Sequence, residues 1–195
     1  MARRIAIIQG HPDPGGSHFC NALADAYASG ARGEGHQIRM IDVARLDFAL
    51  LRTQEEFRNG VPCEDIRDAQ DAISWAEHIV FCYPLWLGTL PALLKGFLEQ
   101  VFREGFAMKM REDGRGWTRL LKGKSARIVV TMGMPALMYR VFFGSHGLKS
   151  LERSILAFAG IAPIRVSLIG LVETRSQESR GRWLIRMQSL GRRAR

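Results

Sequence analysis

The chain has 195 residues, of which 47% are hydrophobic and 24% charged, as in ordinary globular proteins. This length predicts a single domain over residues 1–195, and the composition excludes disordered and collagen-like classes. No uncharged apolar run approaches the ~18–20 residues of a membrane span. The apolar run over residues 5–8 is shorter than the ~7–15 residues of a secretion-signal core, so we expect a cytoplasmic protein.

The net charge of +9 comes from two segments. Residues 101–127 hold eight basic and three acidic residues, and residues 171–195 hold seven arginines and two glutamates. The rest of the chain is nearly neutral. Such a basic chain favours anionic partners, which include nucleic acid, anionic cofactors and acidic membrane surfaces.

In the first half of the chain, apolar runs and helical spacing predict strands that alternate with helices. A turn-rich stretch follows the first strand, and Ser17 is placed to cap the helix after it. The expected elements are a strand over 5–8, a helix over 17–30, a strand over 37–41, an irregular region over 46–64 and a helix over 65–77.

The second half continues this alternation. Pro91 suits the first turn of a helix, and the glycine-rich basic stretch after it reads as a long connection, or a short ribbon. The expected elements are a strand over 78–83, a helix over 92–102, a connection over 103–124, a strand over 126–131, a helix over 148–159, a strand over 163–169 and a helix over 177–190.

This alternation predicts an α/β fold: a doubly wound, five-stranded parallel sheet of order 2-1-3-4-5, with helices on both faces. Ligands of such sheets bind beyond the carboxyl ends of the strands, where the strand order reverses. Three loops meet there, namely 11–17, 84–90 and 131–135. We expect the functional site at these loops.

The three loops carry residues suited to a planar, phosphorylated ligand. The first opens a helix whose backbone N–H groups favour phosphate, although a capped turn that binds nothing is an equal alternative. In the second, Trp86 suits a planar ring or packs against neighbouring loops. Taken alone, Tyr139 is typical of a half-buried tyrosine and His146 of a surface histidine. The scattered histidines and the three separated cysteines predict no metal site and no disulfide framework, and Cys82 suits a small core residue.

Together the loops resemble the flavodoxin-like NAD(P)H:quinone oxidoreductase family. The strongest match is the stretch over 83–102, YPLWLGTLPALLKGFLEQVF, followed by Gly105-Phe-Ala107. His11, Ser17 and Asn21 form a second match, and Thr131-x-Gly133 with Tyr139 and Gly144-x-His146-Gly147 a third. The resemblance covers roughly residues 3–170.

The resemblance implies a bound flavin, FMN or FAD, that takes hydride from NAD(P)H and passes it to a quinone or similar acceptor in a ping-pong cycle. It implies that Tyr139 and His146 are catalytic, stabilising charge or relaying protons near the pyrimidine end of the ring. It also implies a homodimer. The implied cofactor-binding residues are His11, Ser17, Phe19 and Asn21 for the phosphate and ribityl chain, Pro84, Leu85, Trp86, Leu87 and Gly88 for the ring, and Thr131 and Gly133 for its other edge.

Two alternatives remain. Some relatives are ancillary subunits of potassium efflux systems, which predicts a regulatory flavoprotein that binds a membrane protein. Nucleic-acid binding through the basic segments is disfavoured, because no recognition motif accompanies the charge.

Overall fold

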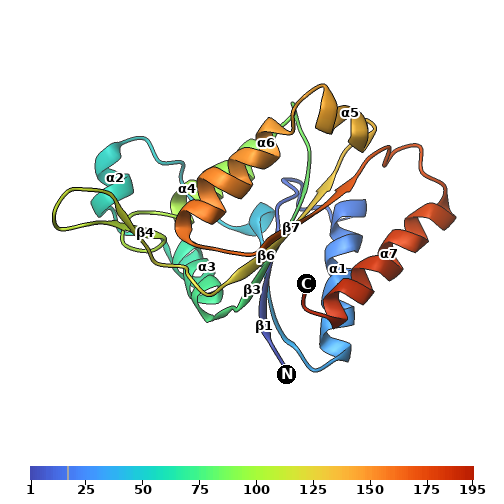
Figure 1. Ribbon diagram of the computed structural model, residues 1–195, viewed down its shortest axis with the longest axis horizontal. Helices are drawn as coiled ribbons and strands as arrows, with labels where there is room; N and C mark the ends of the chain where they lie inside the picture. The colour runs from blue at the N-terminus through green and yellow to red at the C-terminus, as the bar shows by residue number, and fades with distance from the viewer. Residues whose placement is uncertain (17) are drawn as a thin grey trace.

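A parallel sheet forms the centre of the molecule in this computed structural model, which describes residues 1–16 and 18–195 (Figure 1). Five strands pair in the order β2-β1-β3-β6-β7, which confirms the predicted order 2-1-3-4-5. All four strand pairs are parallel. The strands are β1 (Arg4–Gln9), β2 (Gln37–Asp42), β3 (His78–Pro84), β6 (Ser125–Thr131) and β7 (Ile164–Ile169).

Helices cover both faces of this sheet (Figure 1). Successive β1 side chains point to opposite faces. Ile5 and Ile7 pack in a core with α1 and α7, whereas Ala6 and Ile8 pack in a second core with α3 and α4. The helices are α1 (Phe19–Gly33), a 3₁₀ turn (Val43–Arg45), α2 (Gln54–Asn59), α3 (Glu64–Trp75), α4 (Ala92–Val101), α5 (Ala136–Val141), α6 (His146–Lys149), a π-helical segment (Ser150–Ala157) and α7 (Gln177–Arg192).

The structure differs from the predicted elements in three places. The region 46–64, expected to be irregular, contains α2, where Thr53 Oγ1 accepts a hydrogen bond from Glu56 N at 3.1 Å. The helix α5 was not predicted, and the helix expected over 148–159 begins at His146 and is π-helical over Ser150–Ala157. The predicted cap at Ser17 lies outside the described residues, and α1 extends to Gly33.

The basic connection contains a short antiparallel ribbon, as the glycine-rich sequence suggested. Strand β4 (Met108–Met110) pairs with β5 (Trp117–Arg119). Arg103, at the start of this segment, is buried and donates from Nη1 to the carbonyls of Glu56 and Gly60 at 3.1 and 2.8 Å. In the basic tail, Arg180 Nη2 donates to Val172 O at 2.7 Å. Part of the positive charge therefore holds loops together rather than facing a ligand.

In the contact between α1 and α7, glycines allow the two helix backbones to touch each other. A Cβ at Gly191 would lie 2.1 Å from Tyr27 O, whereas a Cβ at Gly181, in the same helix, meets nothing within 4 Å. We expect Gly191→Ala to lower the free energy of unfolding by about 1.5 kcal/mol through overpacking. The matched variant Gly181→Ala should raise it by a few tenths to about 1 kcal/mol, because alanine favours helix. Urea unfolding measures both, and equal midpoints would contradict this account of the packing.

Candidate functional site at the carboxyl ends of the strands

The carboxyl ends of β1, β3 and β6 bring the three predicted loops side by side. Gly10 N, just after β1, donates to Cys82 O of β3 at 2.8 Å. Leu85 N, just after β3, donates to Thr131 O of β6 at 2.7 Å. Backbone hydrogen bonds of the sheet thus continue into the loops and fix where each one starts.

The first loop is held by a cluster of two histidines and an aspartate. His11 is buried, stacks on His18 with ring centroids 3.7 Å apart, and accepts at Nδ1 from Asp13 N at 3.1 Å. His18 Nε2 lies 2.6 Å from Asp13 Oδ2, and Gly15 N donates to Asp13 Oδ1 at 2.8 Å. Burial, and secondarily the charge of His18, lower the pKa of His11, so this ring is neutral at pH 7. Neither Asp13 nor its Asx turn was singled out from the sequence, although Asp-x-Gly is a recognisable turn signal.

The start of α1 presents Phe19 and Asn21 beside this loop, whereas Ser17, predicted to touch phosphate, lies outside the described residues. The guanidinium of Arg180 lies 5.5 Å from the centroid of the Phe19 ring. Asn21 Oδ1 is buried and has no hydrogen-bond partner among residues 1–16 and 18–195. A buried polar atom without a partner is costly, so Asn21 is suited to receive a hydroxyl of a ligand.

The second loop is a rigid two-residue turn that projects apolar side chains into solvent. Trp86 and Thr89 exchange backbone hydrogen bonds of 2.9 and 3.0 Å. Leu87 and Gly88 between them have φ values of 48° and 79°, the left-handed conformation of a tight hairpin turn. Trp86 is 49% exposed and Leu87 fully exposed, and the Trp86 ring meets the His11 ring edge to face at 6.1 Å. Such exposed apolar surface indicates a binding site.

The helix α5, which follows the third loop, contacts the second loop through Tyr139. This side chain is fully buried rather than half-buried as expected from the sequence. Its hydroxyl donates to Gly88 O at 3.2 Å and accepts from Leu148 N at 3.1 Å, and burial raises its pKa. His146 is exposed, as predicted. No local pattern predicts the Tyr139–Gly88 bond, because its partners are 51 residues apart.

The remaining predicted residues lie along the same edge of the sheet. Pro84 ends β3 and pairs in register with Thr131, which ends β6 and is buried. Leu85 is partly buried against the core, and Gly133 is exposed next to Glu173. The structure therefore gathers all of the described site residues at one edge, with contacts from the first loop to the second and from the second to the third.

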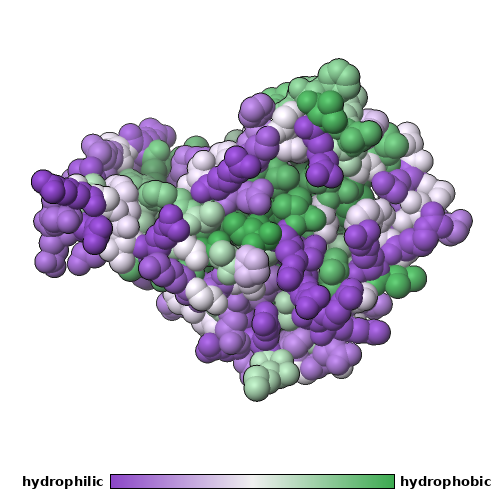
Figure 2. Space-filling model, in the orientation of Figure 1, coloured by the Kyte–Doolittle hydropathy of each residue, from purple (hydrophilic) through white to green (hydrophobic). Residues whose placement is uncertain are grey.

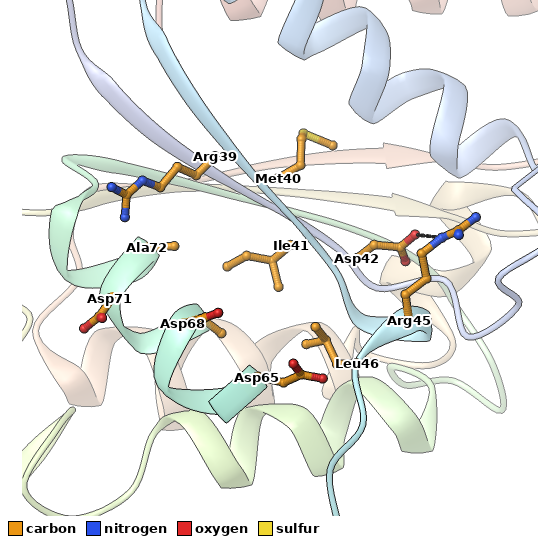
Figure 3. A pocket seen from close by; sticks show the side chains of 11 residues that line it. Arg39, Met40, Ile41, Asp42, Arg45, Leu46, Asp65, Asp68, Asp71 and Ala72 are labelled. Atoms are coloured by element: carbon orange, nitrogen blue, oxygen red, sulfur yellow. Dashed lines mark hydrogen bonds and ion pairs between the residues drawn. The ribbon is translucent and has the colours of Figure 1, made fainter. Parts of the chain in front are cut away.

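A groove of about 620 Å³ lies beside this edge, between β2 and α3 (Figure 3). Arg45 stands at its end, where it donates to Asp42 Oδ2 at 3.0 Å and to Pro14 O of the first loop at 3.1 Å. Three aspartates of α3 line the opposite wall, namely Asp65, Asp68 and Asp71. These carboxylates repel phosphate, so the groove is a poor site for an anionic cofactor.

The family of the chain follows from comparison with known proteins. Residues 3–188 match the Flavodoxin_2 family, described by its flavodoxin-like fold, and the chain belongs to this family. An "uncharacterized NAD(P)H oxidoreductase" of Haemophilus influenzae is 32% identical over 168 residues, which cover 84% of this chain and 82% of that protein. Ribosyldihydronicotinamide dehydrogenase [quinone] of Pongo abelii is 30% identical over 217 residues, covering 96% and 92%. The ancillary protein KefF of a glutathione-regulated potassium-efflux system, from Enterobacter sp., is 30% identical over 156 residues, covering 80% and 74%.

Solved structures share the fold at lower identity. An NAD(P)H:quinone oxidoreductase from Methanothermobacter marburgensis has a TM-score of 0.79 at 24% identity, covering 98% of this chain and 96% of that one. An FMN-dependent NADH-azoreductase from Bacillus anthracis, solved in complex with FMN, has a TM-score of 0.75 at 17% identity, covering 99% of both chains. The matches together confirm the resemblance found in the loops. Within the described part of the chain, no helix combines the length and apolar character that a membrane crossing requires.

Proposed function

We propose that the three loops of this chain hold a flavin between them. The chain is a flavin-dependent NAD(P)H:quinone oxidoreductase of the flavodoxin-like family. The proposal rests on the contacts that join the three loops, His11–Trp86 and Leu85–Thr131, at the edge where doubly wound sheets bind ligands. When bound, a flavin would supply the hydride-transfer chemistry between NAD(P)H and the acceptor.

The side chains at this edge fit such a group. The buried Asn21 Oδ1, which has no partner within the described residues, would accept a hydrogen bond from a hydroxyl of the ribityl chain. Trp86 and Leu87, on their rigid turn, offer an apolar wall to a ring system. Gly88, Thr131 and Gly133 lie where the polar edge of the ring would face backbone groups of the loops. We expect the released flavin to be FMN or FAD.

An absorption spectrum of the purified protein tests this proposal. We expect the visible absorption bands of an oxidised flavin, on the order of one flavin per chain after reconstitution, and menadione-dependent oxidation of NADH or NADPH. A colourless protein that takes up neither FMN nor FAD and oxidises neither dinucleotide would overturn it. Mass analysis of the released flavin distinguishes FMN from FAD.

We infer separate roles for Tyr139 and His146. The Tyr139 hydroxyl donates to Gly88 O and accepts from Leu148 N, which supports a role in positioning the second loop, while the catalytic role implied by the resemblance stays a prediction. The exposed His146 ring is available to donate to charge that develops on a bound ring.

Substitutions of these two side chains should therefore differ in effect. We expect Tyr139→Phe, which leaves Leu148 N without its acceptor, to lower kcat/KM for menadione about tenfold and to weaken flavin binding. His146→Gln should lower kcat about tenfold while flavin affinity stays within about twofold. Steady-state kinetics and flavin titration measure both. If the two variants lose flavin equally, the assignment of separate roles is wrong.

An apolar surface next to the site supports the proposed homodimer. Leu137, Val141 and Phe142 on and after α5 are 71%, 66% and 81% exposed, and Figure 2 shows apolar side chains gathered over this helix. Exposed apolar surface of this kind marks contact with a partner. Light scattering at micromolar concentration should give twice the chain mass, and Val141→Glu should halve it. A wild-type monomer would remove this part of the proposal.

Two further predictions concern a protein partner and the cellular location. The similarity to KefF supports a second candidate function, a regulatory role at a potassium efflux system. In that case we expect the chain to capture a membrane transporter and to show negligible enzymatic turnover. Location in the cytoplasm likewise stays a prediction, which fractionation of the producing cells tests.

A further inference from the structure

Two cysteines that are 62 residues apart in the sequence meet in the interior of the protein. The sulfur atoms of Cys20, in the first turn of α1, and Cys82, in β3, lie 3.3 Å apart. Cys82 Sγ also donates to Cys20 O at 3.1 Å, and the side-chain amide of Gln9 lies 3.6 Å from Cys20 Sγ. Both thiols are free, and both residues are at most 2% exposed. The sequence predicts Cys82 as a core residue and predicts no disulfide framework.

We propose that Cys20 and Cys82 form an oxidisable dithiol, which a peroxide converts into an intramolecular disulfide. Disulfide sulfurs lie ~2.05 Å apart, so the two atoms need to approach by roughly 1.2 Å. One thiolate attacks the peroxide O–O bond to give a sulfenic acid and releases water or an alcohol. The second thiol then displaces water from the sulfenic sulfur, and the peroxide is reduced by two electrons.

The surroundings of the two sulfurs assign the order of these steps. The hydrogen bond with Cys20, together with burial, raises the pKa of the Cys82 thiol well above its usual value. Cys82 lies in β3, a central strand of the sheet, whereas Cys20 lies in the first turn of α1. The end of a helix opens more readily than a central strand, so a small oxidant reaches Cys20 first and Cys82 is the resolving thiol.

The position of the pair gives the linkage a structural consequence. Cys20 stands between Phe19 and Asn21, and Cys82 lies two residues before Pro84 and the second loop. A disulfide would tie the first turn of α1 to the strand that leads to Trp86. This consequence for the site rests on the proposed flavin binding, whereas the oxidation itself does not.

The third cysteine supplies an internal reference. Cys63 is exposed and lies at the start of α3, apart from the buried pair. It reports that the oxidant is active, and its replacement removes disulfides between chains. The variant Cys63→Ser therefore isolates the dithiol.

The test treats the purified full chain with hydrogen peroxide at neutral pH, alkylates it under denaturing conditions and maps its peptides without reduction. In Cys63→Ser we expect both remaining thiols to become resistant to alkylation, with a Cys20–Cys82 linked peptide, a loss of about 2 Da per chain and recovery by dithiothreitol. Cys63→Ser/Cys82→Ser should instead give a sulfenic acid at Cys20 that dimedone traps.

Wild-type protein keeps the proposal testable if the double variant does not fold. Should peroxide oxidise Cys63 fully while Cys20 and Cys82 remain open to alkylation, the pair consists of inert core thiols and the proposal is overturned. A linkage of Cys63 to either buried cysteine overturns it as well. The experiment counts thiols and does not measure enzymatic turnover. Failure of the flavin proposal therefore leaves this result unchanged.

Discussion

Gly147→Ala is expected to weaken flavin binding and to lower the menadione reductase rate by about 100-fold. A Cβ at residue 147 would lie 2.4 Å from Gly88 O and 2.5 Å from Thr89 Cα. Both atoms are backbone, so no side-chain rotation relieves the clash, and the second loop has to move away from α6. This movement breaks the Tyr139–Gly88 hydrogen bond and displaces Trp86 with its turn. Misplacement of binding groups by about 1 Å costs on the order of 100-fold in rate.

The effect should be confined to the site. Gly181→Ala adds the same methyl group in open space on α7 and should leave flavin affinity and turnover within about twofold of wild type. Flavin titration by fluorescence quenching, steady-state kinetics and far-UV circular dichroism separate loss of the site from loss of the fold. If Gly147→Ala retains flavin and activity at the level of Gly181→Ala, then the contact between the second loop and α6 does not shape the site.

The fold could be predicted from the sequence because its signals are local. Each central strand is a short apolar run, and β1 carries apolar residues on both faces, as a sheet covered on both sides requires. Ligands of such sheets bind beyond the carboxyl ends of the strands, so the three loops could be predicted without knowing any contact between them. The helix α2 also has a local signal, Thr53 followed three residues later by Glu56, which is the pattern of a capping box.

The contacts that join the loops could not be predicted in this way, because they depend on side chains distant in sequence. Tyr139 and Gly88 are 51 residues apart, and nothing near Tyr139 indicates that its hydroxyl is buried between two backbone groups. Cys20 and Cys82 meet only because α1 packs on β3. Spacing along the chain therefore identified which loops form the site, while packing determined which side chains are free to act in it.

A loss of about 2.5 kcal/mol of folding stability is expected between pH 7 and pH 4.5 from a single histidine at the other end of the sheet. His78 begins β3 and is 1% exposed, with Nδ1 2.8 Å from Ser125 Oγ. Its Nε2 is buried without a hydrogen-bond partner in the part of the chain that the structure describes. Burial, helped by the positive charges of Arg127, Arg3 and Arg165, lowers the pKa of His78 to about 3.

The sign of the effect follows from proton binding in the two states. An unfolded histidine has a pKa of about 6.5, so between pH 6.5 and 3 the unfolded chain binds a proton that the folded chain does not. Stability is therefore complete above pH 6.5 and falls by about 1.4 kcal/mol for each pH unit below it. His78→Gln removes the titrating group and should lower stability at pH 7, yet its stability should decline less steeply down to pH 4.5. Urea unfolding at half-unit pH steps compares the slopes, and parallel curves for the two proteins would show that His78 takes up its proton without unfolding the sheet.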